Sequence, residues 1–331
     1  MCLFPVEIWN PIFAQACDPR GKVAAAISQV SRYFYQVIGP YRFASLVIYG
    51  ESQIVAFHEA MEVMPPNVPR AKHLYIGFIP ESRVAATRPV CDAVIEGWIQ
   101  HREETETQRD DRTNQNSTLS NFGMYPQEYD SIQGVAVAGI IFQHRGTLET
   151  LTYLTPVSYV NFEMFGCLSS LRDLTVVCLC YKSTFYEIHH SNPLHRQTQF
   201  PSLERLHLSY FDTKPLFDHN EFRRVAPKLT HLRLSGRKCF PQFEKLLPDT
   251  KVLVQVILLS SQEQPHQLGW LRRILSTQQY KQRLKLLEPG HREDCRYGFF
   301  DALLDWLDVS TGGNAFWGDS DQVTIDELAA R

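Results

Sequence analysis

The apolar residues of positions 3–43 fall into three short groups, each spaced like one side of a helix. The sequence Asp-Pro-Arg-Gly at 18–21 is a turn that ends the first helix, and Ser31 can cap the third. Short helices of this kind bury too little apolar surface to be stable alone. The pattern therefore predicts a small three-helix module, residues 1–43, whose core is completed by a partner or by the rest of the chain.

After residue 43 the apolar residues follow a different pattern. Residues 43–49 alternate in the manner of a strand, and residues 53–64 have helical spacing. From residue 71 onward a unit of the form L-x-x-L-x-L recurs, and from residue 148 its copies start about 22 to 32 residues apart. Its copies, some with substitutions, lie at 71–76, 148–153, 171–176, 203–208, 229–234 and, more weakly, 251–256. One copy is typical of any buried strand, but a series indicates a repeat array in which each L-x-L is a strand with two inward side chains.

Helical spacing also occurs between the strand units, at residues 88–100, 132–142, 214–226 and 240–247. Strands that alternate with helices at this period predict a parallel sheet. We therefore expect residues 44–290 to form a leucine-rich-repeat-like α/β solenoid, so that the whole chain mixes a helical module with an α/β domain. The solenoid should be irregular, because Phe211 and Arg237 stand where such repeats usually have Asn or Cys. Residues 101–121 are almost wholly polar and predict a disordered insertion.

Two amphipathic helical patterns lie near the end of the chain, at residues 269–289 and 297–308. A repeat array exposes the apolar face of its last strand unless a terminal element covers it. We expect residues 291–331 to supply a capping helix followed by a mobile acidic tail. The first pattern carries basic residues that form either the solvated face of a helix or a contact for an acidic partner. They are Arg272, Arg273, Lys281, Arg283 and Lys285.

Charge, apolar runs and cysteine usage limit the classes of function that fit this chain. The net charge of −3 lacks the basic excess that nucleic-acid binding usually requires. We expect no membrane span, because no apolar run of about 18 residues occurs, and no signal peptide, because Glu7 interrupts the first apolar stretch. The eight cysteines are scattered without C-x-x-C pairs, which favours reduced thiols in the cytoplasm or nucleus.

The common signatures of catalysis and of nucleotide binding do not occur in the sequence. The best metal candidate combines Cys178 and Cys180 with His189, His190 and His195, but the spacing differs from that of structural zinc sites. Cys178 and Cys180 share one face of a predicted strand, so core packing explains them more simply. We therefore expect no enzyme active site, no metal and no other cofactor.

The N-terminal segment resembles the F-box family, in the form common in mushroom-type fungi. The family pattern reads roughly LPxEIWxxIFxxAC, D-x-x-G, IS-x-VS-R-x-F and PYRF. This chain has FPVEIWNPIFAQAC at 4–17, Asp18, Gly21, ISQVSRYF at 27–34 and PYRF at 40–43. It departs from the pattern at Phe4, where the family usually has Leu, and at Pro11, which falls within the first helix.

This resemblance implies a substrate receptor of an SCF-type cullin–RING ubiquitin ligase. In such complexes the F-box binds a Skp-type adaptor, and the repeat surface holds the protein substrate. Taken position by position from the resemblance, the residues that should face the adaptor are Phe4, Pro5, Ile8, Trp9, Ile12 and Phe13. Internal packing is the alternative role for Ile12 and Phe13, and both roles are open for the apolar residues of the next two helices. Those residues are Val23, Ile27, Val30 and Phe34.

A second function that fits the sequence is a non-catalytic scaffold that keeps the fold but has lost adaptor docking. Phe4 and Pro11 motivate it, because a proline inside a helix removes a hydrogen bond and costs about 3 kcal/mol. One way to avoid this cost is a helix that begins at Pro11 with Asn10 as its cap, leaving residues 5–9 as a separate turn. Adaptor binding distinguishes the receptor from the scaffold.

Overall fold

The computed structural model of this chain describes residues 5–17, 22–64, 70–78, 131–155, 165–178, 199–209, 224–235, 253–257, 284–287 and 299–310. Several sequence predictions lie outside these residues. They are the insertion at 101–121, the helices at 88–100 and 240–247, most of the helix at 214–226, most of the helix at 269–289 with its basic side chains, the side chains of the cysteine–histidine group, the residue Phe4 and the acidic tail after 310.

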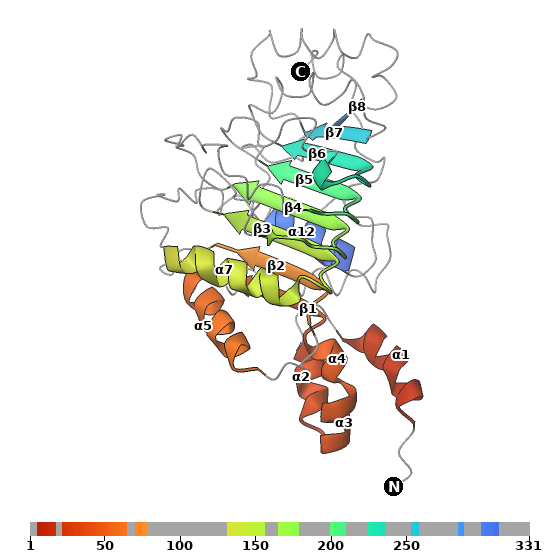
Figure 1. Ribbon diagram of the computed structural model, residues 1–331. Coiled ribbons are helices and arrows are strands. Elements are labelled where there is room, and N and C mark those ends of the chain that lie inside the picture. The colour runs from red at the N-terminus through yellow and green to blue at the C-terminus, as the bar shows by residue number, and fades with distance from the viewer. Residues whose placement is uncertain are drawn as a thin grey trace.

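The chain begins with four short helices, which Figure 1 shows at one end of the molecule. They are α1 (Val6–Ala16), α2 (Lys22–Ser28), α3 (Arg32–Val37) and α4 (Gly39–Arg42). Ser31 caps α3 as expected, since its hydroxyl accepts a hydrogen bond of 3.2 Å from the Phe34 amide. The fourth helix was not predicted; Pro40 near its start favours it, because proline is preorganised for a first helical turn.

Helix α1 runs without a break through Pro11, so the alternative of a helix that begins at Pro11 after a separate turn does not occur. Proline has no amide hydrogen, so the carbonyl one turn earlier, that of Glu7, loses its intrahelical donor. Pro11 is exposed, which leaves water free to bond that carbonyl. The buried contacts that α1 makes through Phe13 offset the cost of the proline.

The described strands form one parallel sheet of eight strands in chain order, so the predicted combination of helices with a parallel sheet is confirmed. The strands are β1 (Ser45–Tyr49), β2 (His73–Gly77), β3 (Thr150–Thr155), β4 (Asp173–Cys178), β5 (Arg205–Ser209), β6 (His231–Ser235), β7 (Leu253–Ile257) and β8 (Leu284–Leu287). Each predicted L-x-x-L-x-L unit supplies one strand from β2 to β7. The stacked strands rise through the molecule in Figure 1.

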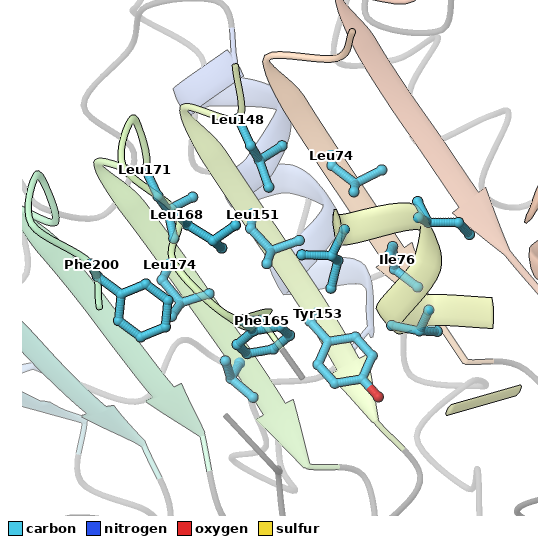
Figure 2. Packing of buried hydrophobic residues seen from close by; sticks show 14 of the residues in the cluster. Leu74, Ile76, Leu148, Leu151, Tyr153, Phe165, Leu168, Leu171, Leu174 and Phe200 are labelled. Atoms are coloured by element: carbon cyan, nitrogen blue, oxygen red, sulfur yellow. The ribbon is translucent and has the colours of Figure 1, made fainter. Parts of the chain in front are cut away.

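Equivalent positions of the L-x-L units lie beside one another in the sheet. The first leucine of each pair forms one column, Leu74, Leu151, Leu174, Leu206 and Leu232, which continues to Val254 and Leu284. Successive side chains of a strand point to opposite faces, so the leucines of this column from β2 to β6 share one face. We call it the leucine face, and Figure 2 shows its packing.

Strand β8 corrects one prediction, because residues 284–287 belong to the stretch 269–289 that was expected to be a helix. Leu284 pairs with Val254 and Leu286 with Val256, so this segment continues the two apolar columns of the sheet. A short run of apolar residues is compatible with the period of a helix and with that of a strand. Here its backbone pairs with β7, so the segment is a strand.

Helices cover both faces of the sheet near its beginning. The leucine face packs against α5 (Glu51–Glu62) and α7 (Ser131–His144), both predicted as helices, in one cluster of buried residues. Helix α12 (Phe299–Ser310), also predicted, lies on the opposite face, behind the strands in Figure 1. None of the helices in the described part of the chain is long and apolar enough to cross a membrane.

The position of α12 differs from the one expected for a cap on the last strand. Its main contacts are with β2 and β3, near the beginning of the sheet. Ala302, Leu303 and Leu307 are fully buried there. The helix therefore packs its apolar stripe against the broad face of the sheet, because more apolar surface is removed from water there than at an edge.

Candidate functional site

Helix α1 has one exposed apolar side and one buried side. Ile8 and Ile12 lie one turn apart, and 49% and 45% of their respective surfaces are exposed. Trp9 and Phe13 lie on the adjoining side, with stacked rings whose centroids are 5.4 Å apart. Phe13 is 3% exposed. A helix that packs along one side must divide neighbouring positions in this way.

The residues expected to face an adaptor therefore divide into two sets. Pro5, Ile8 and Ile12 are exposed. Phe13 packs internally, which is the alternative that the sequence left open for it, and Trp9 is half-buried against Phe34. Of the four later positions, Val23 and Val30 are exposed, whereas Ile27 and Phe34 pack against the buried cluster of the N-terminal helices.

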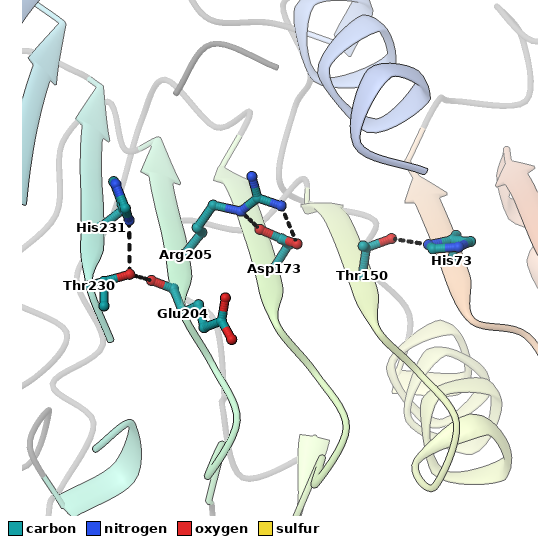
Figure 3. Close-up of polar contacts among 7 residues, drawn as sticks. All are labelled: His73, Thr150, Asp173, Glu204, Arg205, Thr230 and His231. Atoms are coloured by element: carbon teal, nitrogen blue, oxygen red, sulfur yellow. Dashed lines mark hydrogen bonds and ion pairs between the residues drawn. The ribbon is translucent and has the colours of Figure 1, made fainter. Parts of the chain in front are cut away.

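A second candidate site lies on the face of the sheet opposite the leucine face. It is built by the residues that alternate with the leucines, and we call it the polar face. Its residues on β2 to β6 are His73, Tyr75, Thr150, Thr152, Asp173, Thr175, Arg205, His207, His231 and Arg233. The pairing register brings them into two rows across five strands. Figure 3 shows the first of these rows with its hydrogen bonds.

The first row is held by contacts between neighbouring strands. His73 Nδ1 and Thr150 Oγ1 are 3.1 Å apart. Arg205 binds the Asp173 carboxylate with two guanidinium nitrogens, one of which, Nη2, lies 2.8 Å from Oδ2. Such a two-pronged contact fixes the orientation of both side chains. Arg205 is therefore engaged across the strands, as the dashed lines of Figure 3 show.

Burial controls the charge states on this face. It raises the pKa of Asp173, and this effect outweighs the opposing influence of the Arg205 guanidinium. Burial also lowers the pKa of His73. The pKa of His207 lies well below its ordinary value, first because of burial and then because of the nearby Arg233 charge. His207 is therefore neutral at neutral pH, and the arginines are the cations of the polar face.

Helix α12 covers part of the polar face. Trp306 meets Tyr75 edge to face, with ring centroids 6.0 Å apart. The adjacent residue, Asp305, approaches Arg233 of β6 with 3.8 Å between carboxylate oxygen and guanidinium nitrogen. Adjacent residues of α12 thus contact strands that are four places apart in the sheet. This helix therefore packs across several strands of the polar face rather than along one strand.

A cavity of about 20 Å³ remains between α12 and the sheet. Its lining includes Thr152, His207, Arg233, Asp305 and Trp306. This is room for about one water molecule. The Trp306 indole nitrogen is buried and has no hydrogen-bond partner among the described residues. The contact between α12 and the sheet is therefore well packed through apolar atoms but leaves a polar group unsatisfied.

The polar residues of this face are engaged with one another or with α12. Within the described ranges no group of three or more His, Cys, Asp and Glu residues is placed to hold a metal ion. The Asp173 carboxylate is bound by Arg205, and His207 is enclosed. Tyr75 and Arg233 are buried beneath α12, where they contact Trp306 and Asp305. An aromatic contact and an ion pair thus hold α12 on this face.

Sequence reasoning did not single out His207, Arg233, Asp305 or the seat of α12. A signal was present, because the residues between the two leucines of each L-x-L unit must form a face of their own. Which helix covers that face does not follow from the alternation.

In comparisons with models of protein families, with curated proteins and with solved structures, no match to this chain was found.

Proposed function

We propose that this protein is a substrate receptor of an SCF-type cullin–RING ubiquitin ligase. Its N-terminal helices would be an F-box that binds a Skp-type adaptor, and its strands a leucine-rich-repeat-like solenoid that binds a protein substrate. The observation that carries the proposal is the exposure of Ile8 and Ile12. These residues stand at adaptor-facing positions of the F-box pattern and are exposed although their neighbours Trp9 and Phe13 pack inward.

Two further features support the proposal. Helix α1 is continuous through Pro11, so Ile8 and Ile12 keep the spacing of one helix face despite the departure from the pattern. The L-x-L columns stay in register from β2 to β7, as stacked repeats require. The receptor itself performs no chemistry. It raises the effective concentration of substrate lysines near a ubiquitin-loaded enzyme.

Capture by an adaptor tests the proposal. The full chain is co-expressed with a tagged Skp-type adaptor, and the wild type is compared with an Ile8→Asp/Ile12→Asp double variant. We expect the wild type to be captured and the double variant to be lost, because a carboxylate cannot enter an apolar docking surface without its water. Val63, which is 84% exposed at the end of α5, provides the control: Val63→Asp should leave capture unchanged.

Circular dichroism establishes that each variant is folded before capture is compared. Capture that is equal for the wild type and the double variant would exclude α1 as the docking surface. Failure to capture the wild type, with an adaptor that binds another F-box protein, would reject the ligase receptor and leave the scaffold as the function of this chain.

A further inference from the structure

A backbone contact is repeated at the end of the sheet where the chain enters each strand. The carbonyl of the residue before a strand accepts hydrogen bonds from two consecutive amides of the next strand unit. The Lys72 carbonyl, for example, accepts them from the Glu149 and Thr150 amides, at 2.7 and 3.0 Å. These contacts align the residues that precede β2, β3, β4 and β5 in one column, which we call the entry column. Its members are Lys72, Glu149, Arg172 and Glu204.

The side chains of the entry column alternate in charge along the sheet. Lys72 Nζ lies 3.0 Å from Glu149 Oε1, and 57% and 36% of these side chains are exposed. Arg172 and Glu204 follow in the same order of sign, and both are exposed. Neighbouring strands are about 4.8 Å apart, so each charge has only opposite charges beside it in the column. The next position is neutral, where the Thr230 hydroxyl donates to the Glu204 carbonyl (Figure 3).

The apolar columns of the sheet do not distinguish one strand from another in this way. Leu174 and Val176 of β4 pair with Leu206 and Leu208 of β5, and all four are buried in matching positions. Such columns fix the register along a strand, because a slip of one residue would turn the apolar side chains outward. They carry little information about which strand is the correct neighbour. Misassembly and exchange of strands between copies are characteristic errors of repeat proteins for this reason.

The entry column does distinguish neighbours. If a strand paired with the strand two places away, Lys72 would lie beside Arg172, or Glu149 beside Glu204. Like charges on adjacent strands are destabilising, whereas opposite charges are stabilising. A single exposed ion pair contributes little to stability. Selection between two pairings, however, depends on the difference between an attraction and a repulsion, and this difference recurs along the column.

We propose that the entry column selects the order of strands β2 to β5 during assembly of the sheet. Its alternating charges favour the native neighbour of each strand and disfavour the strand two places away. Similar apolar units therefore stack in chain order. The inference goes beyond the proposed function and does not depend on it, because a receptor and a scaffold need the same sheet. Since the side chains are exposed, salt should weaken the selection.

Two rearranged columns separate alternation from the identity of the side chains. The inverted variant, Lys72→Glu/Glu149→Lys/Arg172→Glu/Glu204→Lys, reverses every sign and keeps the alternation. The segregated variant, Glu149→Arg/Arg172→Glu, places two cations beside two anions. Both variants keep the net charge of the wild type. In the segregated variant the positions two places apart carry opposite charges, so that the wrong pairing is favoured.

Refolding at two salt concentrations tests the proposal. Each full chain is unfolded in urea and refolded in about 0.01 M and about 1 M sodium chloride, where the Debye length is about 30 Å and 3 Å. Size exclusion with light scattering measures the yield of monomer, and urea titration measures the unfolding equilibrium constant. We expect the inverted variant to match the wild type within about two-fold. The segregated variant should have an unfolding constant about ten-fold larger in low salt and a lower yield of monomer. Both differences should shrink in high salt.

Two results would overturn the proposal. One is an inverted variant that loses as much as the segregated variant, because the individual side chains would then matter rather than their alternation. The other is a segregated variant that behaves like the wild type in low salt. If the segregated variant does not refold in either salt, Lys72→Glu is compared with Arg32→Glu, the same charge change at an exposed position of α3. Only Lys72→Glu should lose monomer in low salt, and equal yields would reject the selection of strand order.

Discussion

Tyr75 of β2 and Trp306 of α12 meet edge to face, with an angle of 65° between their rings, and join the beginning of the sheet to the last described helix. Both side chains are almost fully buried. A ring edge carries partial positive charge and a ring face partial negative charge, so this arrangement is favourable beyond the area that it buries. The pair therefore couples the sheet to α12.

This coupling predicts non-additive stability. We expect Tyr75→Leu and Trp306→Leu together to reduce the free energy of unfolding by less than the sum of the single substitutions, with an interaction of about 1 kcal/mol. Urea denaturation of the wild type, both single variants and the double variant measures this quantity. Additivity within a few tenths of a kcal/mol would show that the two rings touch without a specific interaction.

Truncation of two adjacent residues of α1 should reduce stability by very different amounts. Phe13→Ala opens a cavity in the cluster that contains Ala24, Val37 and Ile38, and should reduce the free energy of unfolding by about 3 kcal/mol. Ile12→Ala removes a half-exposed side chain and should cost less than about 1 kcal/mol. Thermal unfolding compares the two variants. Equal costs would contradict the division of α1 into a buried and an exposed side.

Gly139 allows α7 to approach α5 closely. A Cβ atom at this position would lie 2.1 Å from the His58 Nε2 atom, so one of the two side chains would have to move. We expect Gly139→Ala to lower stability by about 1 to 3 kcal/mol as an overpacked contact.

Removing the obstructing ring provides the control. In a His58→Ala background the same Gly139→Ala substitution should be almost neutral or slightly stabilising, because alanine favours the helix over glycine by about 1 kcal/mol. Denaturation curves of the four chains test this. An equal cost in both backgrounds would mean that His58 is not what restricts residue 139.

His144 predicts how stability depends on pH. Its Nδ1 atom accepts a 2.9 Å hydrogen bond from the Ala71 amide, and burial, with a smaller effect of Arg70, lowers its pKa to about 4. The unfolded chain binds a proton near pH 6.5, so it holds more protons than the folded chain between pH 6.5 and 4. Stability should therefore fall as the pH falls through this window, by at most about 3 kcal/mol from this residue.

The variant His144→Asn isolates this contribution. Its amide oxygen can accept the Ala71 hydrogen bond but does not titrate in this range. We expect a shallower loss of stability between pH 6.5 and 4, while His73 and His207, whose pKa values are also lowered, keep a slope of the same sign. Chemical denaturation at a series of pH values measures the slopes. An identical slope in the variant would contradict the buried, neutral state of His144.

The local pattern of the sequence was sufficient to predict strands β1 to β7. Each L-x-L unit predicts two inward residues. The strands pair in the register that aligns these positions, in the columns Leu74–Leu232 and Ile76–Leu234. It was sufficient for α5, α7 and α12 as helices, because an apolar stripe with a period of 3.6 residues is a property of each segment alone. The adaptor-facing side of α1 came from the F-box resemblance and stays a prediction, and of the two roles left open for Phe13 the structure has internal packing.

Only the tertiary structure decided where these elements meet. The segment 284–287 fits a helix or a strand by its own pattern, and the edge of β7 makes it a strand. Pro11 stays inside α1 because contacts of Phe13 with later helices offset its local cost. The stripe of α12 shows that the helix is buried but not on which surface. Its place over Tyr75 and Arg233 depends on contacts between residues far apart in the chain, and local spacing carries no information about such contacts.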